Sequence, residues 1–179
     1  MTALVLAGER ILLRPVSPGD GAVLGAIVRE PSVARWWGPE DDWSWIDADG
    51  TRRWAIVLGD SARAAHEDAS GVVGLIQASV EEDPAFRHAG LDLFLATAAQ
   101  GRGLGPEAIH LLARHLIDVE GHHRLVIDPA AENRRAIRAY ERLGFRRVGI
   151  LRRAWWDHER GTWADGVLLD LLAEELHRP

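Results

Sequence analysis

The stretch Gln100-Gly101-Arg102-Gly103-Leu104-Gly105-Pro106 decides how the rest of this sequence is interpreted. It follows an apolar run at residues 91–99 and precedes an amphipathic run at residues 107–120. Three glycines in five residues let the backbone approach a ligand closely. The first turn of a helix carries N–H groups without intrahelical partners and favours negative charge. A strand, a glycine-rich turn and a helix start together therefore predict a phosphate or pyrophosphate site.

Length and composition describe an ordinary globular chain. The 179 residues fit one domain, so we expect a single domain over residues 1–179. The contents of 47% hydrophobic and 27% charged residues are typical of a soluble protein. No apolar run approaches the ~20 residues of a membrane span, and residues 1–10 lack the order of a signal peptide. We expect a cytoplasmic protein without membrane association.

The charge and the reactive side chains narrow the function classes. The net charge is −6, whereas a nucleic-acid binder would more often be basic, so we expect no nucleic-acid partner. Clustered carboxylates suit a cationic small molecule, although acidic surfaces also serve solubility. The chain has no cysteine, which excludes disulfides and a thiolate nucleophile. The eight histidines show no metal-ligand spacing, and we expect no metal.

Tryptophan is unusually concentrated. Five of the eight tryptophans fall between residues 36 and 54, and three between residues 155 and 163. A single tryptophan is most often a core residue, but the first cluster, which includes Trp43 and Trp45, lies in a segment rich in Pro, Gly and Asp. Such a segment is hard to bury completely, so the cluster favours a pocket wall.

Hydrophobic periodicity and turn residues predict a mixed α/β fold. Strands are expected at residues 9–16, 54–58, 71–80, 89–97, 124–127, 145–151 and 167–172. Helices are expected at residues 17–30, 32–38, 107–120 and 134–143, with Asn133 as N-cap of the last and Gly144 after it. Polar connections are expected at residues 39–50 and 59–70, and a segment with Trp155 and Trp156 between the last two strands. The order indicates an antiparallel first half followed by strand–helix–strand units.

Two common phosphate loops do not fit. A dinucleotide-binding loop needs Gly-x-Gly-x-x-Gly close to the first strand, whereas here Pro106 stands at the third glycine and the stretch lies past the middle of the chain. A nucleoside-triphosphate loop needs Gly-Lys followed by Ser or Thr, which the sequence lacks.

The pattern that fits is Gln-x-x-Gly-x-Gly from Gln100, followed by Asn-x-x-Ala-x-x-x-Tyr-x-x-x-Gly-Phe from Asn133 to Phe145. Together these motifs resemble those of the GCN5-related N-acetyltransferase (GNAT) superfamily, and the order of elements matches over essentially the whole chain. The resemblance implies a mostly antiparallel twisted sheet with a splayed parallel pair, flanked by helices. It also implies acetyl-CoA as donor.

A closer resemblance is to the aminoglycoside 6′-N-acetyltransferases. It is carried by Arg-Trp-Trp-Gly at residues 35–38, Gly-Leu-Asp at 90–92, the glycine stretch, Ile-Asp-Pro at 127–129 and Arg-Ala-Ile-Arg at 135–138. Siderophore-lysine N-acyltransferases and ribosomal-protein N-terminal acetyltransferases share part of this pattern. The resemblance implies direct acetyl transfer in a ternary complex to the 6′-amine of an aminoglycoside-type amino sugar. The alternatives are a protein N-terminus, a siderophore lysine or a polyamine as acceptor, or a non-catalytic acyl-CoA-binding module.

The resemblance also implies the donor site. Backbone amides of the glycine turn would hold the CoA pyrophosphate, and Arg102 would add positive charge unless it is simply solvated. The strand before the turn would pair with the pantetheine arm and supply an N–H donor to the acyl oxygen. The residues expected to bind CoA are Leu93, Phe94, Leu95, Gln100, Gly101, Arg102, Gly103, Leu104, Gly105, Pro106, Asn133, Ala136 and Tyr140.

Two residues are candidates for proton transfer. Asp92 is a charged residue in an apolar strand, where burial would raise its pKa to a value useful for a base, unless it points to water. Tyr140 is the single tyrosine, and the resemblance implies that it protonates the CoA thiolate, although it could be a packed aromatic. The presence of both argues against a non-catalytic module.

Residues that would contact the acceptor are Trp36, Trp37, Asp83, Asp92 and Asp128. Asp128 precedes Pro129 and could be a turn residue, and the two tryptophans could be core residues. We expect a small cationic amine as the acceptor. The protein is expected to be a monomer or a homodimer, in which Trp155, Trp156 and Trp163 could supply apolar contacts.

Overall fold

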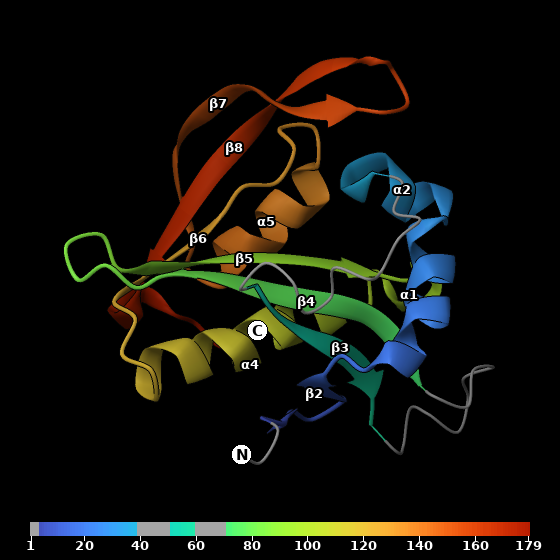
Figure 1. The fold of residues 1–179 in the computed structure, drawn as a ribbon. Helices are drawn as coiled ribbons and strands as arrows, with labels where there is room; N and C mark the ends of the chain where they lie inside the picture. The colour runs from blue at the N-terminus through green and yellow to red at the C-terminus, as the bar shows by residue number, and fades with distance from the viewer. Residues whose placement is uncertain (1–3, 39–50, 60–70) are drawn as a thin grey trace.

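The computed structural model of the protein describes residues 4–38, 51–59 and 71–179 (Figure 1). The predicted acidic connection with Trp43 and Trp45, and the polar connection at residues 60–70, lie outside the described residues. Within the described part, no helix is long and apolar enough to cross a membrane, and no group of three or more acidic, His or Cys side chains could hold a metal ion.

Eight strands form one sheet in the order β1-β2-β3-β4-β5-β6-β8-β7. All neighbouring strands are antiparallel except β5 and β6, which are parallel. This confirms the predicted mixed α/β fold. The strands are β1 (Leu6–Ala7), β2 (Ile11–Pro15), β3 (Arg52–Leu58), β4 (Val72–Glu81), β5 (His88–Leu95), β6 (Arg124–Ile127), β7 (Arg146–Asp157) and β8 (Thr162–Leu172).

The described helices are α1 (Gly21–Val28), α2 (Pro31–Trp37), α4 (Leu104–Asp118) and α5 (Arg134–Arg142), with short 3-10 turns at Pro18–Asp20, Thr97–Ala99 and Ala173–Glu175. The apolar stripe of α4, including Ile109, Leu112 and Leu116, is fully buried in the core against the sheet. Helix α5 begins as predicted, because the Asn133 side chain accepts a hydrogen bond from the Ala136 N–H at 3.2 Å.

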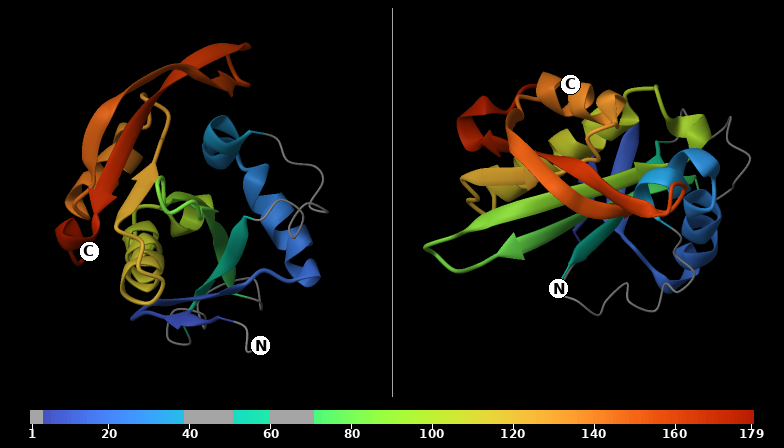
Figure 2. Two further views of the ribbon diagram at one scale, coloured as in Figure 1. Left: turned by 60° about the vertical axis from the view of Figure 1, so that its left-hand side comes forward. Right: turned by 90° about the horizontal axis from the view of Figure 1, so that it is seen from above.

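The parallel pair separates soon after it forms. Strands β5 and β6 are in register at Ala89 with Leu125 and at Gly90 with Val126, and β5 then continues to Leu95 without β6 alongside. The splay confirms the predicted forked sheet. The views in Figures 1 and 2 place α5 and the β7–β8 hairpin on the β6 side of this fork and α2 across from them.

The last two strands are longer than predicted. The segment with Trp155 and Trp156 was expected to be a connection, but it forms the outer part of β7, where Trp155 is opposite Ala164 and Trp156 opposite Trp163. The register shifts between Leu151 and Trp155, and Arg153 has a positive φ of 53°. A bulge of this kind interrupts the alternation of side chains by which strands are recognised, which explains the wrong prediction. Helix α4 also begins earlier than expected, at Leu104.

Candidate active site

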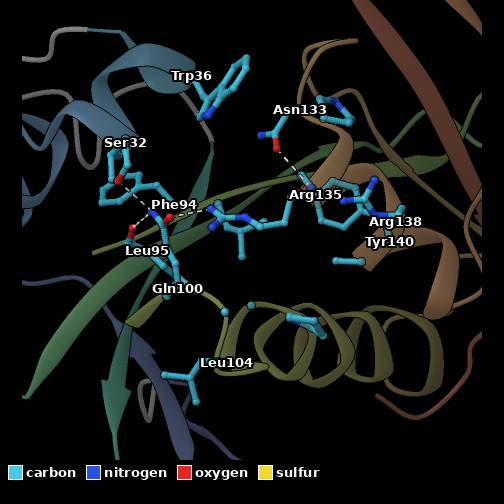
Figure 3. Close-up of a pocket in the computed structure, with 18 of the residues that line it drawn as sticks. Ser32, Trp36, Phe94, Leu95, Gln100, Leu104, Asn133, Arg135, Arg138 and Tyr140 are labelled. Atoms are coloured by element: carbon cyan, nitrogen blue, oxygen red, sulfur yellow. Dashed lines mark hydrogen bonds between the residues drawn. The ribbon is translucent and has the colours of Figure 1, made fainter. Parts of the chain in front are cut away.

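A cleft of about 350 Å³ opens where β5 and β6 separate, and its walls come from α2, β5, the glycine turn and α5 (Figure 3). The structure therefore brings together most of the side chains that the sequence singled out. The predicted residues that line it are Trp36, Trp37, Asp92, Leu93, Phe94, Leu95, Gln100, Gly101, Gly103, Leu104, Gly105, Pro106, Asn133, Ala136 and Tyr140.

The glycine turn is shaped by two residues in the left-handed region. Gly101 has φ 75° and Gly103, the N-cap of α4, has φ 78°. A Cβ at Gly101 would meet no atom within 4 Å, so this side of the turn is open to a ligand. The carbonyl oxygens of Arg102 and Gly103 accept hydrogen bonds from the Arg10 guanidinium at 2.7 and 3.2 Å. The turn is thus held from the sheet side while the first turn of α4 keeps N–H groups for an anion.

Gln100 links three walls of the cleft. Its amide Nε2 donates to the Leu95 carbonyl at 2.9 Å and to the Ser32 hydroxyl at 3.3 Å. Its Oε1 accepts from Arg135 Nη2 at 2.5 Å. Figure 3 shows Arg135 stretched from α5 across the cleft to reach it. The Gln100 side chain is therefore engaged within the protein and ties α2, β5 and α5 together.

Two aspartates lie at matched positions where the sheet divides, Asp92 in β5 and Asp128 directly after β6. Asp92 and Asp128 each lie two residues beyond the last registered pair, Gly90 and Val126. Burial among the walls of the cleft raises the pKa of Asp92 to about 7, the Leu93 N–H donated to its Oδ1 at 2.9 Å opposes this, and the charge of Asp128 adds to it. Partial burial also raises the pKa of Asp128. Asp92 remains accessible from the cleft, so it can meet a ligand there.

Tyr140 points its ring into the same region from α5. The side chain is 9% exposed and packs against Phe145, with 6.2 Å between ring centroids. Burial and the nearby charge of Asp92 raise the pKa of the Tyr140 hydroxyl, so it stays protonated at neutral pH. Among the residues that the structure describes, no hydrogen bond of this hydroxyl is observed. An unpartnered donor that lines a cleft is suited to giving a proton to a bound group.

The model of the acetyltransferase (GNAT) domain matches residues 10–146. The chain belongs to the GNAT acetyltransferase family. It is therefore an acetyl-CoA-dependent N-acetyltransferase.

At least three relatives are similar in sequence. Aminoglycoside N(6′)-acetyltransferase type 1 of Klebsiella pneumoniae is 28% identical over 160 residues, which cover 81% of this chain and 78% of the relative. A kanamycin resistance protein of Rhizobium radiobacter is 41% identical over 72 residues, covering 40% of this chain and 65% of the relative.

Solved structures share the fold. A GNAT-family acetyltransferase from Bacillus anthracis superposes with a TM-score of 0.79 at 17% identity, over 96% of this chain and 100% of that one. Spermidine N-acetyltransferase from Vibrio cholerae, in complex with CoA and spermine, gives 0.76 at 18% identity, over 94% and 98%.

The GNAT cleft contains three arginines that were not predicted as site residues. Arg135, Arg138 and Arg142 line it from α5. Their spacing of three and four residues, which places them on one helix face, was a signal available in the sequence. The predicted Arg102 lies outside the walls of the cleft. Guanidinium groups opposite the open glycine turn fit the phosphates of CoA, which supplies the acetyl group as a thioester.

The tryptophans and Asp83 have different placements in this GNAT enzyme. The Trp37 ring packs edge-on against Phe94 with centroids 4.7 Å apart, so it is part of the wall. The ring of Trp36 packs against that of Trp155 in β7, with 6.1 Å between the ring centroids. Asp83 lies on the β4–β5 connection, where its Oδ1 accepts from the Ala85 N–H at 2.9 Å, outside the walls of the cleft. Of the predicted ligand contacts, Asp83, Arg102 and Asp128 are therefore not among the residues that line the cleft.

Proposed function

We propose that this enzyme transfers the acetyl group of acetyl-CoA to a primary amine of an aminoglycoside-type amino sugar, most specifically the 6′-amine. The observation that carries the proposal is the carboxylate pair Asp92 and Asp128 at matched positions across the fork, beside the unpartnered Tyr140 hydroxyl. The aminoglycoside acetyltransferase relative, which spans most of this chain, supports the choice of acceptor.

The carboxylate pair suits an amine that arrives protonated. An ammonium group between Asp92 and Asp128 would be held by two charge-assisted hydrogen bonds. It must lose a proton before its nitrogen can attack. Asp92, with a pKa of about 7, is matched to accept that proton near neutral pH.

The transfer step uses the two other groups around Asp92. The neutral amine nitrogen forms a bond to the acetyl carbon, the bond from that carbon to sulfur breaks, and the thiolate takes the proton of the Tyr140 hydroxyl. The nitrogen loses its second proton as the amide forms, and that proton returns through solvent to the Tyr140 oxygen. The Leu93 N–H, which donates to the Asp92 carboxylate at 2.9 Å, becomes available to the acetyl oxygen when Asp92 turns to the ammonium group. Asp92 therefore controls both the amine proton and this donor.

Other amines are alternative acceptors that the test distinguishes. A polyamine, a protein N-terminus and a siderophore lysine each present an ammonium group that a carboxylate pair could hold. The sequence has neither cysteine nor lysine, so the purified chain gives no thiol background and no lysine self-acetylation.

The test is thiol release from acetyl-CoA with equal concentrations of kanamycin, spermidine, an N-terminal alanine peptide and a lysine derivative. Mass spectrometry then locates the acetyl group. We expect the highest kcat/KM with kanamycin and a product acetylated on its 6′-amine. Thiol release with another amine but none with any kanamycin-type compound would disprove the proposal.

A further inference from the structure

A row of polar side chains crosses the sheet and ends at Asp92. Arg53 of β3 is in register with Gln77 of β4, and Gln77 is in register with Asp92 of β5. Directly opposite residues of antiparallel strands point to the same face, with their Cβ atoms about 5 Å apart. The three side chains therefore lie beside one another on the face that carries the carboxylate of the proposed base.

Arg53 fixes the orientation of the Gln77 amide. Arg53 is 8% exposed, and its Nε donates to Gln77 Oε1 at 3.0 Å. A guanidinium can only donate, so the atom that it meets must be the amide oxygen. The amide nitrogen Nε2 is consequently left for other partners. The charge of Arg53 polarises the amide and so makes these N–H groups better donors.

This free donor lies beside a carboxylate oxygen that has no donor. In the part of the chain that the structure describes, Gln77 Nε2 makes no hydrogen bond. Asp92 Oδ1 accepts from the Leu93 N–H, but in the same part of the chain Oδ2 accepts from no group. An ionised carboxylate accepts several hydrogen bonds, and each one stabilises the charged form. Gln77 is therefore placed to serve Asp92 when the carboxyl is ionised.

We infer that Gln77 is a positioning residue that holds the Asp92 carboxylate as Asp92 turns to the ammonium group, which rests on the proposed function. Gln77 Nε2 replaces the Leu93 N–H as the donor to Asp92. The Leu93 N–H is then free for the acetyl oxygen, and Asp92 is not left short of a hydrogen bond. One donor replaces another, so the exchange costs little.

The other groups around Asp92 do not offer this exchange. The charge of Asp128 opposes ionisation of Asp92, and the Tyr140 hydroxyl is assigned to the thiolate. Among the described residues, no hydrogen bond or ion pair joins Asp92 to any charged or aromatic residue of the facing helices. Those that line the cleft are Arg135, Arg138, Arg142 and Tyr140 of α5 and Trp36 and Trp37 of α2.

The side-chain amides of the chain allow a direct test. The sequence contains three of them, Gln77, Gln100 and Asn133, so a ¹⁵N spectrum shows three NH₂ pairs and Gln77→Met identifies one. The spectrum is recorded with acetonyl-CoA, in which a methylene between sulfur and acetyl carbon prevents transfer. The amine that gives the most thiol release is then added. We expect the Gln77 signal to move downfield on this addition in the wild type but not in Asp92→Ala. A Gln77 signal that does not respond would overturn the inference.

Replacing Gln77 should affect the ternary complex and spare the enzyme before the amine binds. In Gln77→Met we expect kcat to fall about tenfold and KM for acetyl-CoA to change less than about twofold. The acidic limb of the kcat profile should move to higher pH by about one pH unit, because the ionised carboxylate loses a donor.

The acidic limb of kcat/KM for the amine should stay in place in Gln77→Met, since the Leu93 N–H still binds Asp92 at that stage. A general weakening of the fold would not separate the two profiles. An unmoved limb of kcat would overturn the inference.

Two further variants make the result independent of folding. Gln77→Glu keeps an acceptor for Arg53 but has no amide donor, so the acidic limb of kcat should again move to higher pH; an unchanged limb would count against Gln77. Ser79→Ala is the matched control. Ser79 lies two residues along the same face of β4, opposite Gly90, and its removal should leave both profiles as in the wild type.

Asp92→Asn separates this inference from the proposed function. Wild-type kcat in Asp92→Asn would refute Asp92 as the base, and a Gln77 signal that still responds to the amine would support the hydrogen bond on its own. An inactive Asp92→Asn together with a Gln77→Met variant that matches the wild type in kcat and in both profiles would overturn the inference and leave the proposed function standing.

Discussion

The buried carboxylate of Glu107 accepts two hydrogen bonds from Arg10, one from its backbone N–H and one from Nε, both at 2.8 Å. Glu107 is in the first turn of α4 and is 7% exposed. The remaining nitrogens of Arg10 hold the carbonyl oxygens of Arg102 and Gly103. A residue that precedes β2 thus fixes the shape of the glycine turn.

Replacing Arg10 by Met should weaken CoA binding and lower stability. The turn would lose its support, and Glu107 would keep a buried charge without its partner. We expect the Kd for CoA to rise about tenfold and the free energy of unfolding to fall by about 2 kcal/mol. Calorimetry and thermal unfolding measure the two effects. Arg114→Met, which removes an exposed partner of Asp118, is the control, and unchanged CoA affinity in Arg10→Met would contradict the role of Arg10.

Replacing Tyr140 by Phe should lower kcat about 100-fold and leave the Kd for CoA nearly unchanged, because the hydroxyl is lost while the buried ring remains. Single-turnover kinetics with acetyl-CoA and the best acceptor measure the chemical step directly. If the chemical step in Tyr140→Phe were as fast as in the wild type, Tyr140 would not be the proton donor.

The pH dependence of kcat/KM should reflect the ionisation of the Asp92 carboxyl. Its pKa of about 7 means that the carboxyl is protonated, and unable to accept a proton, as the pH falls below 7. The kcat/KM should therefore decline on the acidic side, and Asp92→Asn should remove this dependence along with most activity. Because the charge of Asp128 raises the pKa of Asp92, Asp128→Asn should move the acidic limb to lower pH. A shift to higher pH would contradict the proximity of the two carboxylates.

The same pKa predicts an effect on stability. The pKa of Asp92 in the folded protein lies above that of an Asp in the unfolded chain. The protonated Asp92 carboxyl therefore favours the folded state below about pH 4, and this contribution to the free energy of unfolding is lost as the pH rises through about 7. Asp92→Asn, which is never ionised, should raise the free energy of unfolding at pH 8 by about 1 kcal/mol after allowance for solvent screening in the open cleft. Chemical denaturation at pH 5 and pH 8 tests this, because the gain should appear at pH 8 and be small at pH 5.

Gly144 should tolerate no side chain. Its φ is 107°, and a Cβ there would approach the Glu175 carbonyl oxygen to 2.0 Å. Gly144→Ala should lower the free energy of unfolding by at least about 2 kcal/mol, measured by urea denaturation. Gly149→Ala is the control, since a Cβ at that position would have no atom within 4 Å. Equal stability of the two variants would show that the chain around Gly144 adjusts.

The sequence predicted local features well. Strand β6 matches residues 124–127, and the Asn133 cap and the glycine turn are where the motifs placed them. Each of these depends on residues within one or two turns of chain, so spacing alone reveals them.

The features that escaped prediction depend on contacts between distant segments. Arg10 and Glu107 are 97 positions apart, and the sequence around each residue does not indicate that they form an ion pair. The matched positions of Asp92 and Asp128 follow from the register of two parallel strands, which a single sequence does not specify. Arg35 pairs with Glu159 because the β7–β8 turn comes close to α2. The bulge in β7 interrupts the strand pattern, so the sequence predicted a shorter hairpin that would not reach α2.

The division of the sheet after Gly90 and Val126 has a mechanical consequence. Beyond these residues β5 and β6 share no ladder hydrogen bonds that would have to break if the two halves of the sheet rotated slightly against each other. A hinge at this junction would therefore be soft, and a small rotation there would become a larger displacement at the far ends of α2 and the β7–β8 turn. Across the groove, side-chain contacts such as Gln100 with Arg135 and Arg35 with Glu159, and not ladder hydrogen bonds, therefore resist such a rotation.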